Sequence, residues 1–356
     1  MKRSWFVAAA LLFLAPAMAL AQPKTATLNP ACRAPGQPVS EAGFVEIGGI
    51  RQWVTVDGQD CANPVVLIVH GGPGNPNTPF AHNLFGDWSK RFTVVQWDQR
   101  GSGKTYGESK PAEGEALTVQ RLTRDGVEVA QYATQRLGKR KVILMGGSWG
   151  SALAVNIAMA RPELFHAYVG TAQLANYQLD MKTSYDKTLA LARAAGDTDA
   201  LSKLEPLGSP PWTNPRAFGI LRRVTRKYEA LKSDPPPAGW FTFGPGYDTS
   251  AYEADYTAGE DYSFLAFVGL HGDGMGPGID LRKLGTQFAM PVYMLQGEAD
   301  LVTPPEVSKA YFDDLSAPKK SFTVLPRTGH DPNRTMVDAQ YAALEKARPE
   351  AVAGDR

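Results

Sequence analysis

Residues 146–150 read Gly-Gly-Ser-Trp-Gly and set a serine between glycines in the order G-x-S-x-G. The apolar run at 142–145 predicts a strand before them, and the small and apolar residues at 151–160 predict a helix after them. Strand, G-x-S-x-G and helix together are the context of a nucleophile elbow, whose tight turn leaves no room for a Cβ at the flanking glycines. We therefore predict that Ser148 is the nucleophile of an acyl-transfer reaction. The alternative is a serine that serves only the turn.

A serine nucleophile needs a general base, and the chain has five histidines that can supply it. His330 lies in Thr-Gly-His-Asp at 328–331, shortly after a predicted core strand at 321–325. This places it at the carboxyl edge of the sheet, where open α/β sheets bind their ligands. We predict His330 as the base, and the alternative for it is a surface histidine. The other histidines lie in weaker positions: His70, His82, His166 and His271.

An acid must hold the histidine in the correct tautomer and stabilise its protonated form. The loop at 296–304, Gln-Gly-Glu-Ala-Asp-Leu-Val-Thr-Pro, follows another predicted strand at 291–295. We predict Asp300 as this acid, because it comes after the glycine turn and before a proline-bounded loop; Glu298 is the alternative. The resulting order of serine, aspartate and histidine along the chain is that of α/β hydrolases, which the choice of residues did not assume.

The reaction also needs hydrogen-bond donors for an oxyanion. One is the main-chain N–H of Trp149, the residue after the serine. We expect the second from the loop after the first core strand, His-Gly-Gly-Pro-Gly at 70–74, where glycine lets the backbone approach a substrate. We assign this donor to Gly72, with Gly71 as the alternative residue. A plain tight turn is the alternative interpretation of the loop.

Residues 101–105, Gly-Ser-Gly-Lys-Thr, end like a phosphate-binding loop. The full pattern requires a glycine at position 98, where this chain has Asp98, and we do not expect the segment 105–111 to begin a helix. We therefore expect no nucleotide. The sequence has no cluster with metal-ligand spacing, so we expect neither a metal nor another cofactor.

The first 21 residues have the parts of a secretory signal peptide: a basic start, an apolar run at 5–14 and Ala-Leu-Ala at 19–21. The apolar run is too short for a membrane span. We expect cleavage after Ala21 and a periplasmic or secreted protein. Without the two basic residues of this segment the net charge is about −1, which gives no electrostatic reason to bind nucleic acid.

Cys32 and Cys61 are the two cysteines of the chain. In an exported protein an isolated pair favours a disulfide, because the compartment is oxidising. The bridge would tie the N-terminal segment to the turn before the first core strand. Two free thiols are the alternative.

Apolar runs that alternate with helical patterns predict a mostly parallel, doubly wound α/β sheet. Two short alternating runs at 44–47 and 52–56 predict an antiparallel hairpin at its start. The pattern changes at 175–287, where helical stretches, proline-rich breaks and glycine–aromatic loops replace the buried strands. We therefore expect a signal peptide (1–21), an α/β core (22–174 and 288–356) and a mainly helical cap subdomain (175–287).

Three motifs together resemble the proline iminopeptidase (prolyl aminopeptidase) family of α/β hydrolases: the loop at 70–74, Asp-Gln-Arg-Gly-Ser-Gly at 98–103, and Gly-Gly-Ser-Trp-Gly-Ser at 146–151. They occur in the order and spacing of that family. The resemblance covers residues 43–175 and 288–335. It implies the α/β-hydrolase fold with a helical cap, the triad named above, and structural roles near the oxyanion loop for Asp98 and Arg100.

Members of that family hold the free amine of an N-terminal proline with glutamates of the cap, one of them within a Trp-x-x-Trp-Glu segment. We do not find that segment in this chain. Acids beside aromatic residues at 252–256 and 259–262 offer Glu253 and Glu260, which can bind an ammonium by charge and by cation–π contact. A solvated acidic loop is the alternative.

These features predict an exported serine hydrolase that releases N-terminal proline, or a similar residue, from small peptides through an acyl-enzyme. The missing amine-binding segment favours a second hypothesis, a carboxylesterase or lactonase that uses the same residues. A non-catalytic binding protein on the same fold is a third hypothesis, which the complete set of nucleophile, acid, base and oxyanion loop disfavours.

Overall fold

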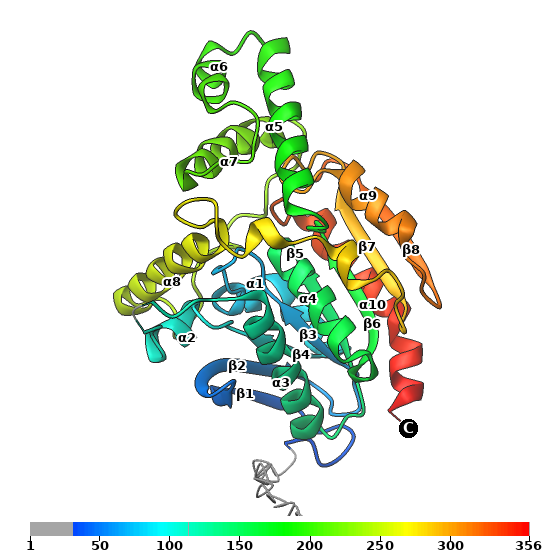
Figure 1. Ribbon diagram of the computed structural model, residues 1–356. Helices are drawn as coiled ribbons and strands as arrows, with labels where there is room; N and C mark the ends of the chain where they lie inside the picture. The colour runs from blue at the N-terminus through cyan, green and yellow to red at the C-terminus, as the bar shows by residue number, and fades with distance from the viewer. Residues whose placement is uncertain (1–30, 113, 356) are drawn as a thin grey trace, which may run out of the picture.

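A computed structural model gives the structure of the chain and describes residues 31–112 and 114–355. The predicted signal peptide, residues 1–21, lies outside the described residues. An 8-stranded sheet forms the centre of the molecule (Figure 1). Its strands are β1 (Val39–Ile47), β2 (Ile50–Gly58), β3 (Val65–Val69), β4 (Thr93–Trp97), β5 (Val142–Gly147), β6 (Phe165–Thr171), β7 (Val292–Gly297) and β8 (Lys320–Leu325).

The strands lie side by side in the order β1-β2-β4-β3-β5-β6-β7-β8. β1 and β2 form the predicted antiparallel hairpin, and β2 also runs antiparallel to β4. All the other neighbouring pairs are parallel. The predicted mostly parallel, doubly wound α/β fold is therefore confirmed.

The central strands are apolar on both faces because helices cover both sides of the sheet. In β3, for example, Leu67 packs into one hydrophobic core and Ile68 into the other, as the alternation of side chains along a strand requires. The first core includes residues of α3 (Val119–Leu137), α4 (Trp149–Ala160) and α9 (Pro305–Asp314). The second includes residues of α1 (Ala81–Phe85) and α10 (Arg334–Gly354).

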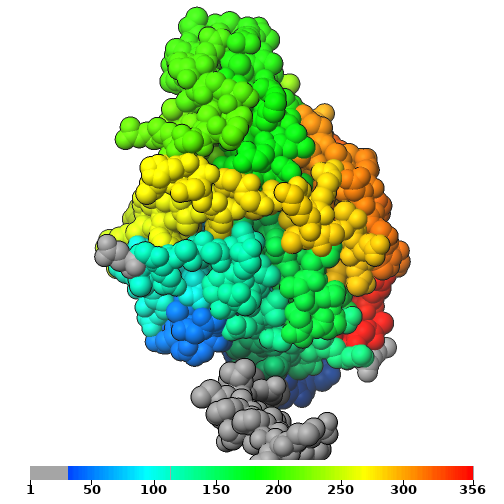
Figure 2. Space-filling model, viewed as in Figure 1, coloured from blue at the N-terminus to red at the C-terminus, as the bar shows by residue number. Residues whose placement is uncertain are grey.

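The chain between β6 and β7 leaves the sheet and forms four helices: α5 (Tyr177–Ala194), α6 (Thr198–Leu204), α7 (Pro215–Ala230) and α8 (Ser250–Val268). Helices α5, α6 and α7 project from the sheet as a lobe, drawn in green in Figures 1 and 2. The lobe has a small core of its own, to which Tyr185, Leu204 and Leu221 contribute. Helix α8 instead lies along α2 (Gly103–Glu108), on the body of the molecule.

One alternative and one expectation about local structure are wrong. The segment that carries Glu253 and Glu260 is the 19-residue helix α8, and not the loop that was the alternative for it. A helix also begins at Gly103, because the buried carboxylate of Asp98 accepts the main-chain N–H of Lys104 at 2.9 Å and so caps the first turn of α2. The Lys104 ammonium lies 4.2 Å and 4.1 Å from the ring centroids of Trp53 and Tyr247, where it packs in a cation–π arrangement.

The predicted disulfide between Cys32 and Cys61 is present, with a sulfur–sulfur distance of 2.05 Å. It ties the segment before β1 to the turn before β3, at the amino end of the parallel strands. Within the described residues, no helix has both the length and the apolar character needed to cross a membrane. The described residues also form short 3-10 helices: η1 (Thr78–Phe80), η2 (Gly86–Lys90), η3 (Pro162–Leu164), η4 (Glu205–Leu207), η5 (Gly276–Gly278) and η6 (Leu281–Leu284).

Candidate active site

The turn between β5 and α4 holds Ser148 in a strained backbone conformation, with φ 53° and ψ −127°. Its glycines are required by close backbone contacts. A Cβ on Gly150 would lie 2.2 Å from the carbonyl oxygen of Val69, and one on Gly146 would lie 2.3 Å from the carbonyl oxygen of Gly150. The turn is therefore packed against the end of β3, as a nucleophile elbow requires.

The structure brings Ser148, His330 and Asp300 together from three loops at the carboxyl edge of the sheet. His330 Nε2 lies 2.9 Å from Ser148 Oγ, and His330 Nδ1 lies 3.0 Å from the nearer oxygen of Asp300. These loops follow β5, β7 and β8, which are parallel, so their ends meet at one edge. Glu298, the alternative acid, is exposed, whereas Asp300 is buried against the histidine.

Asp300 is held as a carboxylate by donors from its own loop. Its oxygens accept the main-chain N–H groups of Val302 and Thr303, the Thr303 hydroxyl and the side-chain amide of Gln296. Burial raises the pKa of Asp300, but the charge and hydrogen bond of His330 and the bonds from Thr303 outweigh it, so the net shift is downward. The ionised acid can then orient the imidazole and stabilise its protonated form.

Burial lowers the pKa of His330, but the charge and hydrogen bond of Asp300 raise it by more, so the net shift is upward from 6.5. The side chain is 8% exposed. His330 can therefore accept a proton from Ser148 and keep it long enough to give it to a leaving group.

The loop at 70–74 lies against the elbow. A Cβ on Gly71 would lie 3.4 Å from Ser148 Cβ, so this part of the loop borders the nucleophile. Gly72 is exposed and has φ +106°, a conformation that only glycine adopts without strain. The bond from Gly72 to Pro73 is cis. Gly71, the alternative donor, is therefore the loop residue whose contact with Ser148 is seen, and the assignment of the oxyanion donors to Gly72 and Trp149 stays a prediction.

Asp98 and Arg100 support the surrounding loops and do not contact the triad. Asp98 accepts the hydroxyl of Thr78 at 2.6 Å as well as the N–H of Lys104, and burial raises its pKa to about 7. Arg100 binds Asp125 at 2.9 Å and the carbonyl oxygen of Gly48 at 2.8 Å. These contacts fit the structural roles that the family resemblance implies for the two residues.

Glu229 is a buried acid beside the triad that the sequence analysis missed. It lies on the last turn of α7, is 5% exposed, and accepts the main-chain N–H of Leu301 at 2.7 Å. Its other oxygen lies 3.2 Å from Arg222, which also binds Asp331 at 2.8 Å. Burial and the charge of Asp300 raise the pKa of Glu229, against the opposing effects of Arg222 and His330.

The one signal in the sequence that points to Glu229 is the adjacent pair Tyr228-Glu229, an aromatic residue and an acid near the end of a predicted helix. In contrast, Glu253 and Glu260 are exposed on α8. The backbone of Glu260 nevertheless lies close to the oxyanion loop, because a Cβ on Gly74 would be 2.8 Å from its Cα. Of the two, Glu260 is the one whose backbone packs against the loop beside Ser148.

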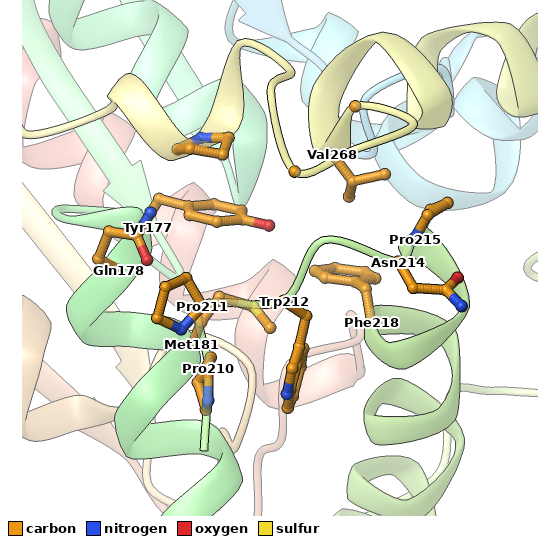
Figure 3. A pocket seen from close by; sticks show the side chains of 13 residues that line it. Tyr177, Gln178, Met181, Pro210, Pro211, Trp212, Asn214, Pro215, Phe218 and Val268 are labelled. Carbon is orange, nitrogen blue, oxygen red and sulfur yellow. The ribbon is translucent and has the colours of Figure 1, made fainter. Parts of the chain in front are cut away.

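A separate small pocket lies in the inserted segment, between α5, α7 and the chain that follows α8 (Figure 3). Tyr177, Met181, Trp212 and Phe218 give it an aromatic and apolar wall. The triad residues are not among the described residues that line it. Phe267 links the two regions, since its ring lies 5.4 Å from that of Tyr177 and 5.5 Å from that of Trp149.

The sheet, the elbow and the three loops that carry the triad are together typical of an α/β hydrolase. Residues 64–333 match the family described as the alpha/beta hydrolase fold, and the chain belongs to that family. It is a proline iminopeptidase-like α/β hydrolase, as the resemblance of its motifs indicated, because curated relatives of that kind match it over most of its length. Solved structures of proline iminopeptidases and a related protein share its fold.

Two relatives illustrate this similarity. The chain is 29% identical over 305 residues to the probable aminopeptidase YbaC of Bacillus subtilis, a match that covers 81% of this chain and 90% of the relative. It is 25% identical over 330 residues to the proline iminopeptidase of Neisseria meningitidis serogroup B, covering 86% and 96%. Among solved structures, the proline iminopeptidase of Mycobacterium smegmatis has a TM-score of 0.61 and 19% identity, covering 89% of this chain and all (100%) of that one, which shows the shared fold.

Proposed function

We propose that this chain is an exported serine hydrolase that releases N-terminal proline, or a similar residue, from small peptides. Ser148 attacks the carbonyl carbon of the scissile bond while His330 takes the hydroxyl proton and Asp300 stabilises the imidazolium. The N–H groups of Gly72 and Trp149 stabilise the oxyanion. His330 then gives its proton to the leaving amine, and a water molecule, activated by the same base, releases the acyl group.

The observation that carries this proposal is the unbroken hydrogen-bond path from Ser148 through His330 to Asp300, at 2.9 Å and 3.0 Å. A nucleophile and base within hydrogen-bond reach, with a third group orienting the base, is the arrangement of serine acyl-transfer enzymes. The names of the two relatives, a probable aminopeptidase and a proline iminopeptidase, support a peptide with a free amino end as the substrate.

An aminopeptidase must also recognise an ammonium close to the scissile bond. Glu229 is best placed for this, because it is buried and its charge interacts with both His330 and Asp300. Leu301 and Arg222 each take one of its oxygens, but a carboxylate has about four acceptor positions and so retains capacity for a further donor. Glu260, beside the oxyanion loop, is the second candidate, and the exposed Glu253 is the third.

Export and the domain division complete the proposal. The disulfide supports an oxidising compartment, periplasmic or extracellular, reached through cleavage after Ala21. The inserted helices support a cap at 175–287 over a core formed by 22–174 and 288–356. Mass spectrometry of protein recovered outside the cytoplasm tests export: we expect an N-terminus at Gln22, and an intact Met1 would contradict it.

An esterase or lactonase remains the second candidate, and one observation favours it. The carboxylate of Glu229 is partly neutralised by Arg222 at 3.2 Å, which weakens its attraction for an ammonium. An ester substrate without an amine would not need that attraction.

The test compares three substrates with wild type and Ser148→Ala: prolyl 4-nitroanilide, its N-acetylated form and a short-chain 4-nitrophenyl ester. We expect the wild type to cleave the free-amine anilide far better than the blocked one, and the variant to cleave neither. Serine-dependent cleavage of the ester alone would overturn the aminopeptidase proposal and establish the esterase. Activity that persists in Ser148→Ala would overturn both.

A further inference from the structure

The middle residue of the motif at 98–100 makes contacts that neither of its neighbours makes. Gln99 is 2% exposed, and its side-chain amide lies between the oxyanion loop and the elbow. Its Nε2 donates to the carbonyl oxygen of His70 at 2.8 Å, and its Oε1 accepts the indole N–H of Trp149 at 3.0 Å. One amide group thus joins the first residue of the oxyanion loop to the residue that follows the nucleophile.

The orientation of this amide is fixed by its partners. Trp149 can only donate through its indole and the carbonyl of His70 can only accept, so a flipped amide would lose both hydrogen bonds. Trp149 is 1% exposed and His70 is 3% exposed, so water does not replace these partners. The link therefore has a single hydrogen-bonded arrangement.

His70 is tied to the same residue a second time. Its Nε2 accepts the main-chain N–H of Gln99 at 3.1 Å, which places the ring proton on Nδ1, 2.9 Å from the carbonyl oxygen of Gly71. Burial lowers the pKa of His70 to about 4, so the ring stays neutral near pH 7 and keeps this pattern. The start of the oxyanion loop is held by both the main chain and the side chain of Gln99.

We propose that Gln99 is a positioning residue that fixes the spacing between the two oxyanion donors, the N–H groups of Gly72 and Trp149. This proposal rests on the proposed function, since the donors matter only if an oxyanion forms beside Ser148. The loop and the elbow already touch at Gly150, where a Cβ would lie 2.5 Å from the carbonyl oxygen of His70. Packing holds the two segments in contact there. The Gln99 amide, which bonds to both, prevents them from sliding past one another.

Loss of the two Gln99 side-chain hydrogen bonds should weaken the stabilisation of the transition state and leave substrate binding in the ground state unchanged. Oxyanion donors stabilise charge that develops only during the reaction, so a small displacement lowers kcat and leaves KM nearly unchanged. We expect Gln99→Met, which keeps the length of the side chain and removes both hydrogen bonds, to lower kcat about 10- to 100-fold. Trp149→Phe removes the indole N–H and, because phenylalanine is smaller, also part of the buried ring, so its urea midpoint of unfolding is measured beside its kcat.

The chain offers a matched control for effects on folding. Gln52 is fully buried and makes the same pair of contacts away from the triad: its Oε1 accepts the indole N–H of Trp97 at 2.6 Å, and its Nε2 donates to the carbonyl oxygen of Ile47 at 3.0 Å. Gln52→Met should lower the urea midpoint of unfolding about as much as Gln99→Met. Only Gln99→Met should lower kcat.

The experiment measures kcat, KM and the pH profile of wild type, both methionine variants, Trp149→Phe and the double variant Gln99→Met/Trp149→Phe, on whichever substrate the wild type cleaves. We expect a lower kcat with KM within about twofold, an unchanged acid limb, and a loss of kcat in the double variant that is smaller than the product of the two single losses, because both substitutions remove the same hydrogen bond. Unchanged kcat, a rise in KM that accounts for the loss, or an equal loss in Gln52→Met would overturn the proposal. Failure of Ser148 as nucleophile is detected separately by Ser148→Ala.

Discussion

The Glu229 carboxylate accepts the main-chain N–H of Leu301 at 2.7 Å, one residue beyond Asp300. On the same helix, Arg222 binds Asp331, one residue beyond His330, at 2.8 Å. Helix α7 therefore contacts both loops that carry the triad acid and base. Movement of α7 relative to the sheet would change the surroundings of His330 directly.

This arrangement predicts two effects of Glu229→Gln. Glutamine still accepts the N–H of Leu301, but the lost charge lowers the pKa of His330, so the acid limb of kcat/KM moves to lower pH. If Glu229 binds the substrate ammonium, KM for prolyl anilide rises roughly 10- to 100-fold while the ester is unaffected. Glu205→Gln, which removes an exposed acid of the same lobe, serves as the control and should change neither quantity. An unchanged KM and pH profile would rule out a role for the Glu229 charge.

The pH dependence of turnover follows from the triad. His330 must be neutral to act as base, and its pKa is raised from the ordinary 6.5, so activity falls as the pH drops through a value above 6.5. In Asp300→Asn the carboxylate that raises this pKa is gone, so the limb moves down and kcat falls roughly 10⁴-fold. Initial rates of the wild type and of Asp300→Asn, measured between pH 5 and 9 at constant ionic strength, check both predictions. An acid limb well below pH 6.5 in the wild type would contradict the assignment of His330 as the base.

The elbow and the triad loops were accessible to sequence analysis because each directly follows a strand in a short motif. Glu229 could not be found in the same way, because its contact with Leu301 joins residues 72 positions apart. No periodic pattern of apolar residues indicates a contact of this kind. Helix α8 was missed for another reason. Its buried side includes Tyr252, Gly259, Ser263 and Phe267, which are helically spaced but do not form an apolar stripe.

Close packing at the elbow predicts that Gly150→Ala does not fold normally. Its Cβ would lie 2.2 Å from the carbonyl oxygen of Val69, and the two main-chain segments cannot separate without moving β3. We expect a loss of about 3 kcal/mol or more in the free energy of unfolding, together with loss of activity. Gly43→Ala is the matched control, since nothing lies within 4 Å of its Cβ position. Equal stability of the two variants in urea would show that the elbow is less tightly packed.

The disulfide should stabilise the fold and leave catalysis unchanged. It closes a loop across 29 residues, at the end of the sheet opposite the triad. Replacing both cysteines by serine should lower the free energy of unfolding by about 3 to 4 kcal/mol, through the larger entropy of the unfolded chain. Urea unfolding of the variant and of reduced wild type should agree, with kcat unchanged at 25 °C. A change in kcat without a change in stability would contradict this separation.

Reaction with a fluorophosphonate, followed by peptide mapping, tests most directly whether Ser148 is the nucleophile. We expect one adduct per chain, on Ser148, absent in Ser148→Ala and formed at least about 100-fold more slowly in His330→Ala. An adduct on another residue, or equal labelling of Ser148→Ala, would contradict the assignment of Ser148, His330 and Asp300 as the catalytic triad.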